Sequence, residues 1–240
     1  MKINGKMIIA VAAGVVVVAG IMTAAVSVAG GSTDVVKSGS VAAFNKVLTA
    51  IPDQVTKDEK NSGWSLAAPD GSVRFIWSQD YSSSPLHDVM LEFDAKPFLD
   101  AGLDTEKLPE NYAFYEDMLM VGQKLGNDKL TYEGEPTALA AYEQITDKYR
   151  PSLNYHAAMD HFGVKLGDGN MFEWAKNMEI NTATNEKQDK DIVFVLNPQP
   201  LIAAGVDPEK VEGWTYGQVP VEENGRMVNV YKLLKPFDLQ

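Results

Sequence analysis

Residues 88–108 read DVMLEFDAKPFLDAGLDTEKL, and residues 191–211 read DIVFVLNPQPLIAAGVDPEKV. The two stretches align without a gap. Asp, Pro, Ala, Gly, Asp, Glu and Lys recur at matching places, and most other differences exchange one apolar residue for another. Self-similarity of this kind indicates that one structural unit occurs twice in the chain.

The similarity continues upstream of both stretches. The matched residues are Phe44 and Tyr142, Trp64 and Phe162, Asp70-Gly71 and Asp168-Gly169, and Trp77 and Trp174. We therefore expect an α+β fold of two tandem, internally duplicated subdomains, residues 41–135 and residues 136–240.

Each unit is predicted to contain a helix, a second helix, a hairpin, a strand, a helix and a strand. Apolar residues recur at helical spacing over 41–51 and 139–149, and each run ends near a proline. That proline is expected to open the second, short helix, which we place at 153–162 in the second copy. The Asp-Gly pairs favour the tight turn of a hairpin, because glycine adopts positive φ without a steric penalty.

The best-preserved stretch is predicted to be a strand followed by a capped helix. Residues 89–93 and 192–196 are mostly apolar, as in a central strand. The predicted N-caps are Asp94 and Asn197, the predicted helix-closing glycines are Gly102 and Gly205, and the predicted caps of a further short turn are Asp104 and Asp207. The final strands are expected at 112–121 and 227–234, and Asn224-Gly225 is expected to join the latter to 218–221.

The N-terminus is predicted to cross a membrane. Residues 7–29 carry no charge and are long enough for a transmembrane helix, which needs about 20 apolar residues. Lys2 and Lys6 precede this run, so residues 1–6 are expected in the cytoplasm and the globular part outside. The alternative is a cleaved signal peptide and a secreted protein. Residues 30–40 are small and polar, and we expect a flexible linker there, with Ser40 capping the helix that follows.

Charge and composition exclude several classes of protein. The formal net charge is −12, and such a surface repels phosphate backbones, so nucleic acid is not an expected partner. The sequence contains no cysteine, so disulfides, thiolate metal sites and cysteine nucleophiles are absent from it.

No motif identifies a catalytic residue, a cofactor site or a metal site, and we assign none. The sequence has three histidines, and none is shared between the two copies. On the predicted helix 153–162, His156 and Asp160 would lie one turn apart, whereas His161 would point elsewhere. Whether His156, Asp160 and His161 bind a metal is left open by the sequence.

Two repeated features have a structural explanation. Trp77 and Trp174 are expected to be core anchors, with carbohydrate stacking as the alternative. The acidic pairs that begin at Asp104 and Asp207 are expected to cap short helical turns.

The resulting hypothesis is a membrane-tethered, extracytoplasmic protein that is not an enzyme. It would bind an unknown protein or small molecule in a groove between its two repeats, since ligand sites favour such interfaces. The alternatives are an exported hydrolase or metal-dependent enzyme with its site in the second repeat, and a component of a cell-surface assembly.

Overall fold

A computed structural model describes residues 33–83, 87–149, 152–157, 159–176, 192–223 and 226–237. Residues 31–240 form one compact unit. Three predicted features lie outside the described residues: the cytoplasmic segment at 1–6, the membrane segment at 7–29 and the turn at Asn224-Gly225. No helix in the described ranges combines the length and the hydropathy that a membrane span requires.

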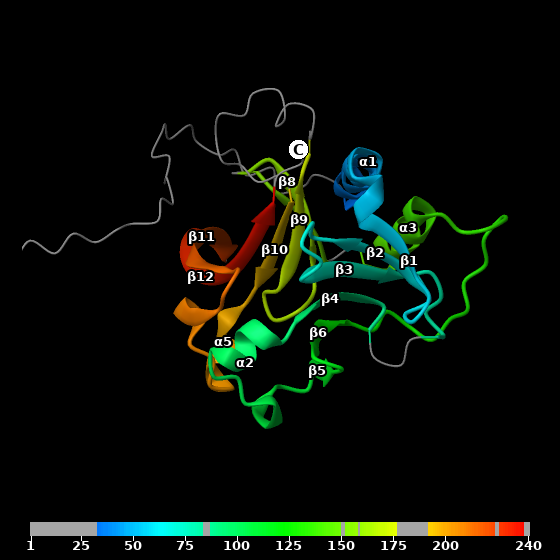
Figure 1. The fold of residues 1–240 in the computed structure, drawn as a ribbon. Helices are drawn as coiled ribbons and strands as arrows, with labels where there is room; N and C mark the ends of the chain where they lie inside the picture. The colour runs from blue at the N-terminus through cyan, green and yellow to red at the C-terminus, as the bar shows by residue number, and fades with distance from the viewer. Residues whose placement is uncertain are drawn as a thin grey trace, which may run out of the picture. The chain divides into compact units, whose positions relative to one another are not determined.

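The fold is α+β, and its described strands form two six-stranded antiparallel sheets (Figure 1). The first half contains α1 (Thr33–Ala50), η1 (Pro52–Gln54), β1 (Val55–Asp58), β2 (Gly63–Ala67), β3 (Val73–Ser78), β4 (Val89–Asp94), α2 (Lys96–Asp100), η2 (Thr105–Lys107), β5 (Tyr112–Tyr115) and β6 (Met118–Gln123). The second half contains α3 (Ala138–Lys148), β7 (Leu153–His156), β8 (His161–Lys165), β9 (Met171–Ala175), β10 (Ile192–Leu196), α5 (Pro198–Ala203), η4 (Pro208–Lys210), β11 (Thr215–Glu223) and β12 (Arg226–Phe237).

Both sheets have the same topology. The first has the strand order β1-β2-β3-β4-β6-β5, and the second has β7-β8-β9-β10-β12-β11 when read from its other end. In each half the last hairpin pairs with the apolar strand of the repeated stretch, β4 or β10. The coil between β6 and α3, residues 124–137, contains the boundary expected at residue 135.

The predicted second helix of each unit is confirmed only as one short 3-10 turn, η1, which Pro52 opens in the first half. Strand β1 follows that turn, and in the second half β7 stands where the helix was predicted; each of these strands pairs with the next one. Residues 157, 159 and 160 lie in a turn rather than in the middle of a helix, with Asp160 at φ 53°. These runs are short, so pairing with an apolar neighbouring strand outweighs their weak helical periodicity.

The predicted flexible linker is wrong from Thr33 onwards, because α1 begins there. Ser40 therefore lies inside the helix and does not cap it. Its buried hydroxyl is 2.6 Å from the hydroxyl of Tyr142 on α3, and this partner from the other half satisfies it.

The predictions for caps and turns are mostly confirmed. Asn197, Asp104 and Asp207 each accept a hydrogen bond from a backbone N–H in the following turn. Asp94 does not act as a cap, since it ends β4 and Ala95 occupies the N-cap of α2. The single strand expected at 112–121 is a hairpin, β5 and β6, with its turn at Glu116 and Asp117. The expected pairing of 218–221 with 227–234 is confirmed by β11 and β12.

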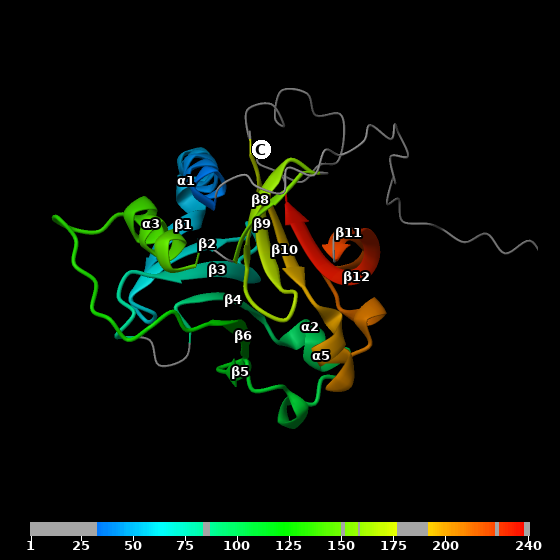
Figure 2. The ribbon, with the colours of Figure 1, turned by 180° about the vertical axis from the view of Figure 1, so that it is seen from behind.

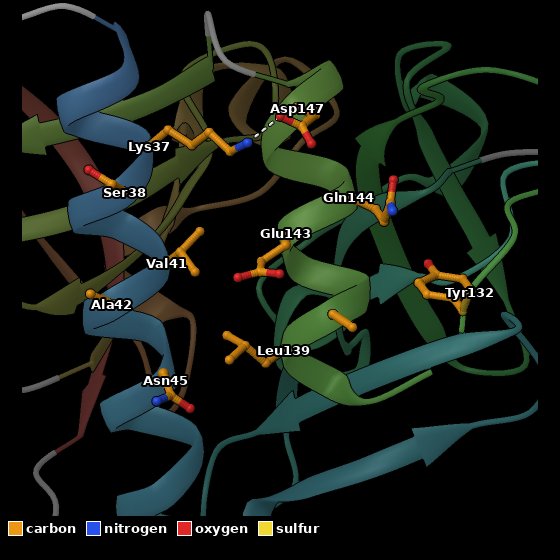
Figure 3. A pocket seen from close by; sticks show the side chains of 11 residues that line it. Lys37, Ser38, Val41, Ala42, Asn45, Tyr132, Leu139, Glu143, Gln144 and Asp147 are labelled. Carbon is orange, nitrogen blue, oxygen red and sulfur yellow. Dashed lines mark hydrogen bonds and ion pairs between the residues drawn. The ribbon is translucent and has the colours of Figure 1, made fainter. Parts of the chain in front are cut away.

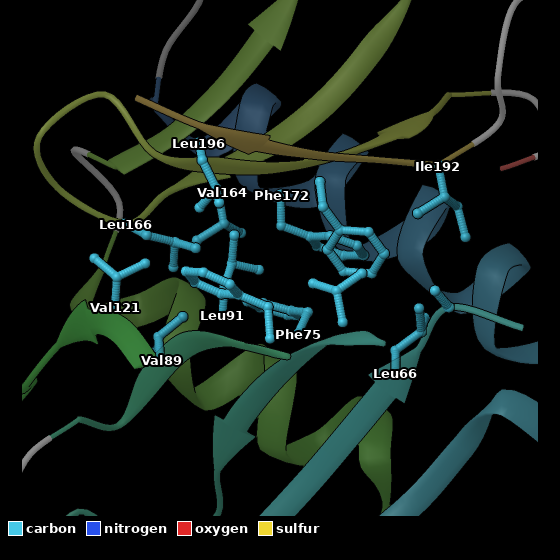
Figure 4. Packing of buried hydrophobic residues seen from close by; sticks show 14 of the residues in the cluster. Leu66, Phe75, Val89, Leu91, Val121, Val164, Leu166, Phe172, Ile192 and Leu196 are labelled. Atoms are coloured by element: carbon cyan, nitrogen blue, oxygen red, sulfur yellow. The ribbon is translucent and has the colours of Figure 1, made fainter. Parts of the chain in front are cut away.

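One hydrophobic core lies between the two sheets and joins both halves (Figure 4). At its centre the equivalent residues Phe75 and Phe172 stack on each other, with ring centroids 4.4 Å apart and planes 10° apart. The rings of Phe44 and Tyr142, another equivalent pair, have their centroids 4.1 Å apart. Because equivalent residues meet each other, an approximate twofold axis relates the halves through these contacts.

The two long helices are exchanged between the halves. Helix α1 packs against β7, β8 and β9 of the second sheet, and α3 packs against β2 and β3 of the first. Figure 2 shows the same arrangement from behind, with α1 near β8 and α3 near β2. Each sheet therefore depends on the other half of the chain for the helix that covers it.

The repeated stretch itself meets its own copy on the axis. The backbone N–H of Asp104 donates to the carbonyl of Ala204 at 2.7 Å, and that of Asp207 donates to the carbonyl of Ala101 at 2.8 Å. Between these bonds, a Cβ on Gly102 would lie 2.7 Å from the carbonyl oxygen of Gly205, and the reverse distance is also 2.7 Å. Both glycines thus have positive φ and also permit close backbone contact.

We predict that Gly102→Ala lowers the free energy of unfolding by about 2 kcal/mol or more, because an unfavourable φ of 105° adds to a clash with backbone. Gly71→Ala is the matched control, since Gly71 has φ 72° but its Cβ would meet no atom within 4 Å. Urea denaturation measures both. Equal losses in the two variants would contradict close packing at the axis.

Candidate binding groove

A groove of about 630 Å3 lies between α1 and α3, so each half contributes one wall (Figure 3). The two helices that wall it also contact each other directly, through Ser40 and Phe44 of α1 and Tyr142 of α3. The side chains that line it are Lys37, Ser38, Val41, Ala42, Asn45, Tyr132, Leu139, Ala140, Glu143, Gln144 and Asp147.

The groove combines an apolar surface with a polar rim. Val41 and Leu139 point into the space between the helices (Figure 3), and the small side chains of Ala42 and Ala140 also line the groove. At one end Lys37 of α1 forms an ion pair with Asp147 of α3. A surface with these properties suits a ligand that has both an apolar part and a polar group.

Glu143 is the charged group within the groove whose carboxylate has no partner among the described residues. Its exposed side chain lies between the helices (Figure 3). The side-chain amides of Asn45 and Gln144 likewise make no hydrogen bond to another described residue, so these polar groups are available to a ligand. Helical periodicity predicted the buried faces of α1 and α3. Asn45, Glu143 and Gln144 lie outside those predicted faces.

A second cavity, of about 820 Å3, lies mostly in the second half, with Gln123 of β6 as its lining residue from the first half. Its walls include the turn between β8 and β9, Asn197 at the start of α5, and Val221, Val230 and Lys232 of the β11–β12 hairpin. Lys232 is buried and donates to the carbonyl of Gly169 at 2.9 Å. This lysine therefore holds the hairpin against the turn.

The structure brings His156 and His161 together and separates Asp160 from them. His156 and His161 are directly opposite each other on β7 and β8. Asp160 lies in the turn and contacts Tyr155 and Lys176 instead. No group of three or more His, Cys, Asp or Glu side chains in the described part of the chain is arranged to hold a metal ion.

The histidine pair has a partner that the sequence did not reveal. Buried Glu173 of β9 has Oε1 3.7 Å from Nδ1 of His156 and Oε2 4.0 Å from Nδ1 of His161. The Glu173 carboxylate raises the pKa of His156 against the opposing effect of burial, and the carbonyl of Pro220 on β11 also raises it. Because side chains alternate along a strand, the sequence places Glu173 on the face of β9 opposite to that of Trp174. The sequence does not indicate that this second face is also buried.

Both repeated tryptophans are core residues, as predicted. Trp77 and Trp174 are completely buried, so neither is available to stack on a carbohydrate. Trp77 donates its Nε1–H to the carbonyl of Ala138 at 2.9 Å, which attaches α3 to the first sheet.

Comparison with protein-family models, with curated proteins and with solved structures finds no match. The function is therefore inferred from the geometry of this chain.

Proposed function

We propose that the protein is an extracytoplasmic binding module, tethered to a membrane by residues 7–29, that binds its partner in the groove between α1 and α3. The observation that carries this proposal is a groove with one wall from each half and with unpartnered polar groups above an apolar surface. The tether rests on the uncharged N-terminal run and on the two lysines before it.

We infer further that the two halves arose by tandem duplication of one unit. The identical strand orders and the contacts between equivalent residues support this origin. Duplication also accounts for the groove, because a site on the axis between two copies contains side chains from both.

The expected ligand is a polypeptide segment that presents a Lys or Arg side chain beside apolar residues. Glu143 provides an uncompensated negative charge in the groove, and the net charge of −12 attracts cationic partners over a longer range. The free amides of Asn45 and Gln144 can bond to a peptide backbone. The same charge disfavours nucleic acid and anionic lipid.

Binding can be tested with residues 31–240 and a short labelled peptide of alternating Leu and Lys, with a Leu–Glu peptide for comparison. We expect the Lys peptide to bind and to shift the NMR signals of residues 37–45 and 139–147. Glu143→Lys should weaken binding by about tenfold or more, because it replaces attraction with repulsion.

Glu110→Lys is the matched control, because Glu110 is exposed and lies outside the groove. This substitution changes the net charge by the same amount as Glu143→Lys. An equal loss of binding in both variants would show that only overall charge matters. Signals that shift elsewhere on the protein would also refute the groove as the site.

The tether has a separate test. The full chain should stay with membranes through an alkaline wash, whereas residues 31–240 should not, because only a buried apolar helix resists this treatment. Release of the full-length, uncleaved chain by the wash would contradict the anchor.

A further inference from the structure

The last hairpin of each half differs in length. Strands β5 and β6 of the first half pair over four positions, and a tight turn joins them. Strands β11 and β12 pair over nine positions. Among the described strands, β10 pairs with residues 233–237 of β12, so residues 226–232 extend the hairpin beyond that strand. This extension has no counterpart in β5 and β6, and it forms one wall of the second cavity.

Lys232 of this hairpin is a buried cation at a position where the fold accepts an apolar side chain. Its equivalent in the first half is Met118, because the two residues directly precede Leu119 and Leu233, which occupy equivalent places opposite β4 and β10. Lysine is seldom buried in proteins, since its ammonium group loses hydration. Lys232 is only 8% exposed, so its presence calls for a functional explanation.

The turn between β8 and β9 has the shape that this lysine requires. Lys232 donates to the carbonyl of Gly169 at 2.9 Å, and a Cβ on Gly169 would lie 2.8 Å from the Nζ of Lys232. A side chain at residue 169 would therefore displace the ammonium group from the cavity lining. The equivalent Gly71 has a similar positive φ, but a Cβ there would meet no atom within 4 Å. The close contact of glycine with lysine is thus specific to the second half.

The described lining of the cavity is cationic, although the chain as a whole is acidic. Lys165 is its second lysine, and it forms no ion pair with another described residue. The acid of the lining is Asp168, whose carboxylate accepts a hydrogen bond from Asn111 at 2.6 Å. Two lysines and one aspartate leave one positive charge, which a single carboxylate would balance. Salt screens long-range repulsion by the rest of the chain, but it screens contacts inside a cavity much less.

An apolar wall adjoins the two lysines. Met171 is the strand partner of Lys165 across β8 and β9. Val230 is two positions from Lys232 and therefore lies on the same face of β12, because side chains alternate along a strand. Val221 of β11 also lines the cavity. A ligand with its charged group at the lysines would place an adjoining aliphatic chain along this apolar wall.

We propose that the second cavity binds a small organic acid. Its carboxylate contacts Lys165 and Lys232, and its aliphatic chain lies along the apolar wall. The volume of about 820 Å3 is within the range of small-molecule sites. The site is separate from the groove between α1 and α3, so neither site depends on the other. It explains why a buried lysine and a longer hairpin occur together in one of two equivalent halves.

Octanoate is the probe, titrated into the full chain in discs of neutral phospholipid, with empty discs as the blank. We expect saturable binding that shifts the methyl NMR signals of Met171 and Val230 but not those of Val41 and Leu139 in the groove. Acetate lacks the aliphatic chain and octanol lacks the charge, so each should bind about tenfold or more weakly than octanoate.

Lys232→Met should weaken octanoate binding by about tenfold or more. This variant should remain folded, because methionine occupies the equivalent position in the first half. Lys165→Gln should also weaken binding, and its exposed position guards against a folding defect. Lys129→Gln is the charge-matched control, because Lys129 is exposed and lines neither cavity.

Unchanged affinity in both Lys232→Met and Lys165→Gln would overturn the proposal, as would an equal loss in Lys129→Gln. Equal binding of acetate and octanoate would also overturn it, because the apolar wall would then have no role. Methyl shifts confined to the groove between α1 and α3 would place the octanoate elsewhere and exclude the second cavity as its site.

Discussion

Separated halves of this chain, residues 31–135 and residues 136–240, are expected to be unfolded as monomers. Each half would lose the helix that covers its sheet, since α1 and α3 each pack on the sheet of the other half. Each would also expose one side of the shared core. For the first half this side includes Phe44, Phe75 and Trp77, which contact residues of the second half.

The size of the lost burial energy decides whether an isolated half can fold. Burial of a large apolar side chain contributes about 1.5–3 kcal/mol, so three such residues account for about 5–9 kcal/mol. The total stability of a domain is only about 5–15 kcal/mol. Circular dichroism and NMR dispersion of each purified half measure the effect, and a cooperatively folded monomer from either half would contradict it.

The matched control cuts the chain without removing either half. A protease site inserted at Gly134 lies in the coil between β6 and α3, where a Cβ would meet no atom within 4 Å. After cleavage, the two fragments should remain together and keep the near-ultraviolet spectrum of the intact protein. Separation of the fragments without denaturant would show that the shared core is weaker than the geometry indicates.

Phe172→Ala should lower the free energy of unfolding by about 3–5 kcal/mol, the largest effect expected of a single substitution in this chain. Phe172 is completely buried and contacts the rings of Phe75, Trp174 and Phe194. Truncation would leave a cavity bordered by both halves, which cannot collapse without moving one sheet towards the other.

Phe114→Ala is the corresponding control on β5, where the side chain is 41% exposed, and we expect a change of about 0.5 kcal/mol. Urea denaturation with an unchanged slope compares the two variants. A loss below about 2 kcal/mol for Phe172→Ala would argue against a continuous core at the axis.

Local sequence patterns determined much of this fold. The repeat at 88–108 and 191–211 located β4, β10 and the turns that follow, since side-chain caps and positive-φ glycines act within a few residues. The buried tryptophans followed from alternation along their strands. Both long helices were predicted because their apolar residues recur at helical spacing, although α1 begins earlier than expected.

The tertiary structure decided the features on which function depends. Residues 153–156 become a strand only because β8 offers a partner, and the histidines meet Glu173 only through that pairing. The exchange of α1 and α3 likewise leaves no local signal, since either sheet could bury the same apolar helix face. Contacts between distant segments depend on the free energy of the assembled core, whereas periodicity and capping report only on the nearest residues.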